Sequence, residues 1–187
     1  MRTYIERAMD FIREVFPYIS EDLEYPMALR KAIRQFNADK TRNVIVRSGC
    51  ARVAMITSDY VIKFDYDEEE VQEIGGSLNE VHLYEIAERE GFDYLFAKIT
   101  PFHYKGHDFY IMPRIYGISD NNKRGWEYMT PQERAWCKSH SLTDLHNGNF
   151  GFRNGHICIV DYGFQEDLVE ECDYSSEEYI IEDETEE

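Results

Sequence analysis

The chain has 187 residues, of which 43% are hydrophobic, and a formal net charge of −17. This length and composition predict one compact unit or two small lobes that share a cleft. They exclude a membrane-spanning helix, which needs about 20 consecutive apolar residues, and the charged residues Arg2, Glu6 and Arg7 interrupt the start where a signal peptide would lie. The acidic excess also argues against direct binding to nucleic acid, whose phosphates repel it.

Residues 1–40 predict two amphipathic helices. Residues 3–16 and 26–36 both carry apolar side chains at helical spacing. Thr3 and Glu6 have the spacing of a capping box, which marks the start of the first helix. Apolar stripes of this kind usually face a core. We therefore expect both helices to pack on the domain that follows, with a partner subunit as the alternative.

Three β-rich runs follow, at residues 44–46, 51–56 and 59–64. Their β-branched and aromatic residues, bounded by turn residues, predict three antiparallel strands. The loop between the first two contains one glycine, Gly49, and the third run carries Lys63 near its end.

A helix and two further strands are predicted next. Residues 77–87 have an apolar stripe at helical spacing, and Ser77 with Glu80 has the spacing of a second capping box. Residues 94–99 and 108–112 read as strands joined by a polar turn. After them, Thr130 and Pro131 begin a strong helix signal that also has a glutamate at the third helical position.

The most informative stretch runs from Asp144 to Asn149 and continues, after a short insertion, to Asp161. Residues 150–160 predict a hairpin, because Asn154-Gly155 is a preferred dipeptide of tight turns. The hairpin would place Asn149 and Asp161 side by side at the edge of a cleft. Phosphoryl transfer needs one group to orient the attacking hydroxyl and two oxygen ligands for Mg²⁺. Two carboxylates and a carboxamide supply these groups, and a surface hairpin with acidic flanks is the alternative.

This stretch resembles the catalytic and metal-binding loops of the protein-kinase-like superfamily. The nearest variant is the Asp-Leu-His-x-Gly-Asn loop of aminoglycoside and choline phosphotransferases and of small bacterial or phage kinase-like proteins. The resemblance implies an α+β fold with a five-stranded antiparallel small lobe, a much reduced large lobe and extra N-terminal helices. The implied segments are the helices in 1–40, the small lobe in 41–115, the reduced large lobe in 116–165 and an acidic tail in 166–187.

The resemblance also implies ATP and Mg²⁺ as cofactors and assigns a role to each motif residue. Asp144 would be the catalytic base, while Asn149 and Asp161 would be metal ligands. Lys63 would bind the α- and β-phosphates. Glu80 would be the partner of Lys63, although the capping role competes for the same side chain.

Further contacts with the nucleotide are implied along the backbone. Gly49 would approach the phosphates, and the main chain at Met112 and Arg114 would bind adenine. Pro113 removes one donor from this segment. Glu85 is the reserve choice as partner of the lysine.

The sequence departs from the kinase pattern in the catalytic loop. Leu142 occupies the position where a histidine often braces the catalytic aspartate. Thr143, His140 or His146 would have to take over that task. His146 itself is expected to be a buried, hydrogen-bonded loop residue rather than a chemical group.

Two functions remain open. One is a minimal kinase that phosphorylates a protein hydroxyl, or less readily a small-molecule hydroxyl. The other is a catalytically inactive kinase-like binding or inhibitor protein that captures a partner. Residues 166–187 hold 12 of the 37 acidic residues and no Lys or Arg, which predicts a solvated tail that either aids solubility or docks on a basic partner. Four scattered cysteines predict free thiols in a reducing cytoplasm, that of a bacterial host if a phage encodes the chain.

Overall fold

The computed structural model describes residues 2–20, 23, 26–49, 52–66, 76–117, 124–142 and 144–163. The predicted acidic tail, residues 166–187, lies outside these ranges. The two N-terminal helices are present as α1 (Tyr4–Ile19) and α2 (Pro26–Lys40). An antiparallel sheet follows in the order β1-β2-β3-β5-β4, made of β1 (Ile45–Ser48), β2 (Arg52–Ile56), β3 (Tyr60–Asp65), β4 (Thr100–Tyr104) and β5 (His107–Pro113).

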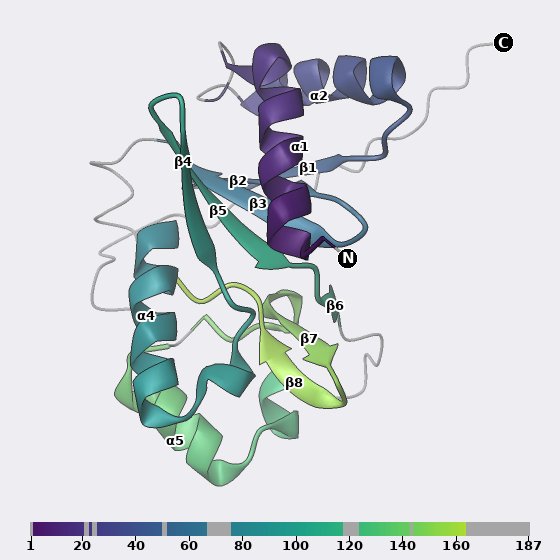
Figure 1. Ribbon diagram of the computed structural model, residues 1–187. Coiled ribbons are helices and arrows are strands. Elements are labelled where there is room, and N and C mark those ends of the chain that lie inside the picture. Colours follow the sequence, from purple (N-terminus) through teal and green to yellow (C-terminus); the bar gives the residue numbers. More distant parts are fainter. Residues whose placement is uncertain are drawn as a thin grey trace, which may run out of the picture.

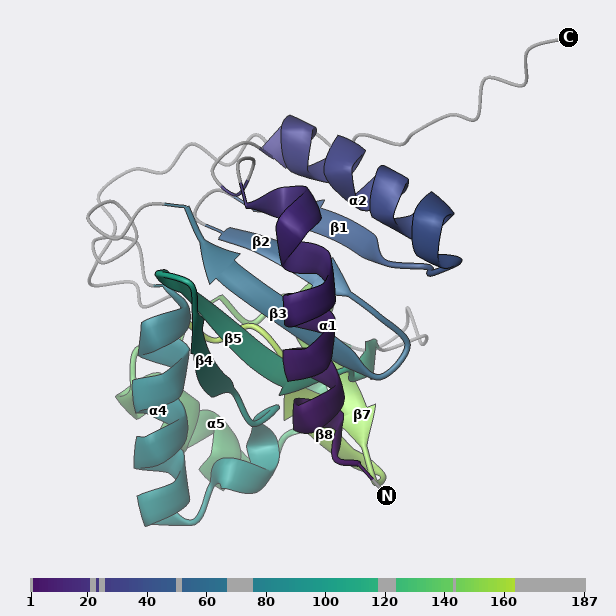
Figure 2. The same cartoon turned by 45° about the horizontal axis from the view of Figure 1, so that its top comes forward.

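A second group of elements lies on the other side of this sheet from α1 (Figures 1 and 2). It contains the helices α4 (Ser77–Glu90) and α5 (Pro131–Ser139) and a small sheet in the order β6-β7-β8. The strands of that sheet are β6 (Tyr116–Gly117), β7 (Phe150–Arg153) and β8 (His156–Ile159). The hairpin predicted around Asn154-Gly155 is therefore confirmed, with both turn residues at positive φ.

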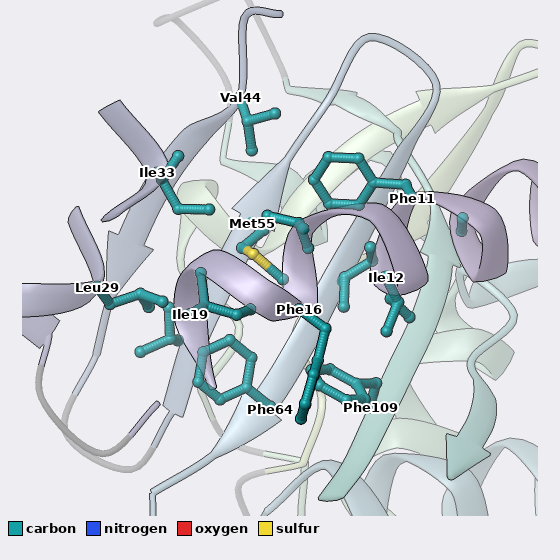
Figure 3. Packing of buried hydrophobic residues seen from close by; sticks show 14 of the residues in the cluster. Phe11, Ile12, Phe16, Ile19, Leu29, Ile33, Val44, Met55, Phe64 and Phe109 are labelled. Carbon is teal, nitrogen blue, oxygen red and sulfur yellow. The ribbon is translucent and has the colours of Figure 1, made fainter. Parts of the chain in front are cut away.

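Side chains that alternate along the central strands divide the interior into two hydrophobic cores. Ile62 on β3 and Ile111 on β5 point to the first core, which α1 and α2 complete. Figure 3 shows this core, with Phe16 and Ile19 of α1 above Phe64 and Phe109. Successive strand residues point to opposite faces, so the neighbours of Ile62 and Ile111 face the second core with α4 and α5. The N-terminal helices pack on the sheet, as expected.

One predicted strand is wrong in position. Residues 94–99 contribute to a short 3₁₀ helix, Asp93–Leu95 (η1), and to a single bridge between Phe96 and Ile159. The true edge strand β4 begins at Thr100 and runs into the turn at Gly106. The cause is tertiary: Ala97 N donates a hydrogen bond to Ile159 O at 2.9 Å, so this segment pairs with the distant hairpin. Local β-propensity cannot foresee such a partner.

Both capping boxes that open α1 and α5 are confirmed. At the start of α5, Thr130 Oγ1 accepts from Glu133 N at 3.2 Å, and Glu133 Oε2 accepts from Thr130 N at 2.5 Å. We predict that Thr130→Ala lowers the free energy of unfolding by about 1 kcal/mol, because a helix N–H then loses its acceptor. Urea denaturation measures the change. Thr130→Ser is the matched control and should keep most of the stability, since it retains the hydroxyl; equal losses in both variants would contradict the capping role.

The two described cysteines that were expected to be free thiols, Cys137 and Cys158, are buried and form no disulfide. Burial raises the pKa of the Cys137 thiol to about 12 and that of Cys158 to about 11. Both thiols are therefore protonated at neutral pH and unsuited to nucleophilic chemistry. Within the described ranges, no helix combines the length and the apolar character that crossing a membrane requires.

Candidate active site

A buried ion pair lies between the central sheet and α4. Lys63 on β3 faces the second core because its neighbours Ile62 and Phe64 face the first. Its Nζ lies 2.8 Å from Glu80 Oε1 and 3.0 Å from Glu80 Oε2. Glu80 is fully buried, and Lys63 is 5% exposed. A buried charge persists only with a partner, so the pairing holds α4 against the sheet.

Glu80 does not take part in a capping box. The N-cap of α4 is Gly76, which makes no side-chain capping bond. Asp65 at the end of β3 supplies the acceptor at the start of α4 instead. It accepts from Ser77 N at 2.9 Å and from Ser77 Oγ at 2.8 Å. The capping alternative is therefore wrong, because a carboxylate from another element satisfies the helix start. The preferred assignment, Glu80 as the partner of Lys63, is the one that the structure shows. The reserve choice, Glu85, is exposed on α4.

The segment after β8 closes over this pair. Tyr162 N donates to Glu80 Oε1 at 3.0 Å, and the Tyr162 hydroxyl donates to Ala97 O at 2.7 Å. Gly163 then lies so near α4 that an added Cβ would stand 2.6 Å from Gly76 O. Only glycine fits that approach. The chain after Asp161 is thereby fixed against the beginning of α4.

Asp161 sits at the edge of the ion pair. Its Oδ1 lies 3.8 Å from Lys63 Nζ, and the same lysine donates to Val160 O at 3.0 Å. The Asp161 side chain is 39% exposed, in contrast to the buried Glu80. One carboxylate is thus closed off from solvent while the other remains accessible to a ligand.

The loop before β7 brings two predicted site residues together. Asn149 Nδ2 donates to Asp144 O at 2.8 Å and to Asp144 Oδ2 at 3.2 Å. Val160 N donates to Asn149 O at 2.9 Å, which joins this loop to the residue before Asp161. The hairpin β7–β8 therefore carries Asn149 at one end and Asp161 at the other, as the sequence indicated.

The brace for Asp144 differs from the histidine of the kinase pattern. His146 Nε2 lies 3.7 Å from Asp144 Oδ1, while its Nδ1 accepts from Gly148 N at 3.0 Å. His146 is hydrogen-bonded, as expected, but its side chain is exposed rather than buried. His140 is engaged elsewhere, stacked on Trp136 with ring centroids 4.0 Å apart. Thr143 lies outside the described residues, so the Asn149 amide is the brace that the structure shows.

Arg52, the first residue of β2, belongs to the site and was not singled out from the sequence. Its Nη2 donates to Asp161 Oδ1, and its Nη1 lies 3.2 Å from Glu80 Oε1. The strand register could have revealed it: Ala54 pairs with Lys63 across the β2–β3 hairpin. Arg52 is two residues from Ala54 and so lies on the same face as the lysine.

The four charges of Arg52, Lys63, Glu80 and Asp161 perturb one another. Burial acts to raise the pKa of the Asp161 carboxyl, but Lys63 and Arg52 outweigh it and hold that pKa below its ordinary value. Burial acts to lower the pKa of Arg52, and the carboxylates of Glu80 and Asp161 raise it above the usual value. Arg52 and Asp161 are therefore both charged at neutral pH.

The predicted backbone contacts with the nucleotide are partly engaged within the protein. Gly49 N donates to Arg52 O at 2.9 Å, which closes the β1–β2 hairpin. Arg114 N donates to Asp59 O at 3.0 Å. Neither N–H is free for a phosphate or for adenine in this conformation. Nucleotide contact at these two segments stays a prediction. Met112 is buried at the end of β5, within the second core.

The oxygen atoms at this edge fit a magnesium ion. Asn149 uses its amide nitrogen for Asp144, which leaves the amide oxygen to act as a ligand. Asp161 adds an ionised carboxylate. Mg²⁺ is typically held by one or two such protein oxygens, with substrate phosphates and water completing the octahedron. Within the described ranges, no three His, Cys, Asp or Glu side chains gather as a self-sufficient metal site.

The structure combines a five-stranded antiparallel sheet, a lysine of β3 paired with a helical glutamate, and two loops that meet at the edge of that pair, which is the arrangement expected from the sequence resemblance. The chain is similar to the Lpg2603 kinase of Legionella pneumophila bound to IP6, with a TM-score of 0.45 and 15% identity over 67% of this chain. It covers only 50% of that kinase. It is also similar to the aminoglycoside phosphotransferase APH(2'')-IIa in a ternary complex with streptomycin and ATP, with a TM-score of 0.40 and 12% identity over 74% of this chain and 73% of that one. No protein-family model and no curated protein matches the sequence.

Proposed function

We propose that this protein is an ATP- and magnesium-dependent phosphotransferase that phosphorylates a protein hydroxyl. One observation carries the proposal: the buried Lys63–Glu80 pair lies beside Asp161, and the β7–β8 hairpin connects Asp161 to Asn149 and Asp144. Catalysis of phosphoryl transfer consists largely of positioning and charge stabilisation. The groups needed for both are assembled at this one edge.

Each residue has a distinct task in the proposed reaction. Asp144 accepts a hydrogen bond from the acceptor hydroxyl and takes its proton as the new oxygen–phosphorus bond forms. The bond between the γ-phosphorus and the β–γ bridging oxygen breaks, and ADP leaves. Lys63 stabilises negative charge on the phosphates, and Glu80 holds its ammonium in place. Mg²⁺, held by Asn149 and Asp161, would neutralise phosphate charge when bound.

Exposure around Asp144 is compatible with a macromolecular acceptor. The Asp144 side chain is 31% exposed, and the neighbouring His146 side chain is 62% exposed. An acceptor hydroxyl can therefore approach from solvent on a protruding segment of another protein. We place this reaction in a cytoplasm, where ATP is abundant.

A second candidate function is favoured by Arg52. Its guanidinium is bonded to Asp161, the carboxylate that a metal ion would need. A site whose metal ligand is permanently neutralised would bind no Mg·ATP. The protein would then act as an inactive kinase-like binding protein that captures a partner.

Thermal unfolding of the purified protein separates the two candidates. Mg·ATP at about 100 times its dissociation constant should stabilise the fold by about 2.7 kcal/mol, a rise of several degrees in the thermal midpoint. ATP with EDTA should give a smaller rise, because the phosphates then lack the metal. Asp161→Asn should abolish the magnesium dependence, whereas Asp108→Asn, at an exposed aspartate of the β4–β5 hairpin, should retain it. No shift at millimolar nucleotide would contradict the phosphotransferase and favour partner capture.

A further inference from the structure

Arg52 is a cation in a place where the predicted chemistry needs anionic ligands. It enters the second core from β2 and is 14% exposed at its side chain. It contacts the two carboxylates of the site, Asp161 through Nη2 and Glu80 at 3.2 Å through Nη1. Together with Lys63 it offsets the negative charge of these carboxylates.

Binding of a metal ion would disturb this balance. Asp161 Oδ1 already accepts from Arg52 and lies 3.8 Å from Lys63 Nζ. A divalent cation on the same carboxylate adds two positive charges beside these two. Like charges at such distances repel strongly in a partly desolvated site. Arg52 must then leave Asp161, and a desolvated guanidinium requires another anion.

One N–H group of the Arg52 guanidinium is available to a ligand. Arg52 Nη1 is buried and forms no hydrogen bond with any residue that the structure describes. Its contact with Glu80 Oε1 at 3.2 Å is an ion pair without hydrogen-bond geometry. Phosphate oxygens suit the planar fork of arginine, which donates two parallel hydrogen bonds.

The β1–β2 hairpin leaves room for this role. Glycine-rich loops bind phosphate through free backbone N–H groups that approach the ligand closely. Gly49 N instead donates to Arg52 O, and a Cβ at Gly49 would meet nothing nearer than that oxygen at 3.9 Å. The glycine is thus neither crowded nor free to donate. A side-chain cation at the base of the hairpin can supply the positive charge that Gly49 N, engaged with Arg52 O, does not offer.

We propose that Arg52 is a phosphate-binding residue of this site: it occupies Asp161 while no nucleotide is bound, and it moves to the phosphates when a divalent metal ion takes its place on Asp161. The inference rests on the proposed phosphotransferase function and deepens it. It reconciles a metal-binding Asp161 with the arginine that now holds it. It also makes phosphate and metal binding cooperative. A metal ion on Asp161 releases Arg52 for the phosphates, and phosphates that bind Arg52 free Asp161 for the metal ion.

Calorimetric titration of the full-length protein with Mg·ATP tests the phosphate contact. Arg52→Met should weaken Mg·ATP binding about tenfold or more, the value of a lost charge-assisted hydrogen bond. Adenosine, which has no phosphate, should bind the variant as it binds the unchanged protein, as followed by saturation-transfer NMR. Arg47→Met is the matched control: Arg47 is an exposed arginine on the neighbouring strand β1, and its loss should change neither affinity.

Titration with Mn²⁺ alone, followed by electron paramagnetic resonance, tests the competition at Asp161. Arg52→Met should bind Mn²⁺ more tightly than the unchanged protein, since the competing guanidinium is gone. Opposite effects on Mn²⁺ and on Mg·ATP are the signature of the proposed exchange, and a merely structural arginine would weaken both. Circular dichroism establishes that the variant is folded. If Arg52→Met does not fold, Arg52→Lys keeps the charge without the fork and should lose part of the Mg·ATP affinity.

The outcomes separate the phosphate-binding role of Arg52 from the proposed phosphotransferase function. If the unchanged protein binds Mg·ATP and Arg52→Met binds it equally or more tightly, Arg52 is only an obstacle to the metal and the inference is wrong. The same holds if folded Arg52→Lys binds Mg·ATP as the unchanged protein does. If the unchanged protein binds no Mg·ATP, the proposed function itself fails and the inference fails with it.

Discussion

Glu80→Gln is expected to lower the free energy of unfolding by about 3–5 kcal/mol, the range seen when one partner of a buried ion pair is removed. Glutamine keeps the size of the side chain and an oxygen for the Tyr162 N–H. It removes the charge that compensates Lys63, which is 5% exposed. Arg52 cannot substitute, being a cation itself. Urea denaturation at neutral pH gives the difference.

The double variant Lys63→Met with Glu80→Gln is the control for this loss. It removes the buried ammonium together with its partner, so no unpaired lysine remains. Most of the stability should return, because buried ion pairs replaced by uncharged groups of similar volume are often nearly neutral. A double-mutant cycle then isolates the pair interaction. A Glu80→Gln protein as stable as the unchanged one would show that Glu80 is not ionised in the fold.

Asp144→Asn is expected to reduce phosphoryl transfer by a factor of about 10²–10⁴, the usual contribution of a positioned general base. Nucleotide binding should persist, because the main-chain carbonyl of residue 144 still accepts from Asn149 Nδ2. The measurement is single-turnover release of labelled γ-phosphate from ATP, with water as the acceptor in place of the unidentified protein. Calorimetry with Mg·ATP supplies the affinity on the same sample.

Asp39→Asn is the matched substitution, because Asp39 is an exposed carboxylate on α2, outside the proposed site. It should leave the turnover unchanged. Equal turnover in Asp144→Asn and in the unchanged protein would remove Asp144 from the reaction. A joint loss of turnover and of Mg·ATP affinity would instead assign it a binding role, since loss of a transition-state interaction lowers the rate alone.

Much of the site could be predicted because its signals are local. The Asn154-Gly155 turn fixes the hairpin, and the hairpin alone brings Asn149 near Asp161. The capping box of Thr130 and Glu133 likewise lies within four consecutive residues. Such signals depend on a few neighbouring dihedral angles and so survive in any tertiary setting.

The features that sequence reasoning missed depend on partners far along the chain. Ser77 looked like a capping residue, but Asp65 from β3 decides how α4 begins. Residues 94–99 looked like a strand, but Ala97 pairs with the hairpin of residues 150–159 instead. Arg52 was not singled out from the sequence, and only the register of β2 with β3 places it beside the lysine. Tertiary contacts override local propensity in each case.

The contacts that complete the site differ greatly in the sequence separation of the two residues that they join. Lys63 and Glu80 are 17 residues apart, whereas Glu80 and Tyr162 are separated by 82 and Arg52 and Asp161 by 109. Closing a longer loop sacrifices more entropy, and long-range contacts form late when nothing nearer draws their ends together. During synthesis the lysine and glutamate can therefore meet long before the segment at residues 160–163 exists. A nascent chain would carry this pair open on one side, with Arg52 lacking its aspartate, and the electrostatic balance of the site would be among the last properties that the protein acquires.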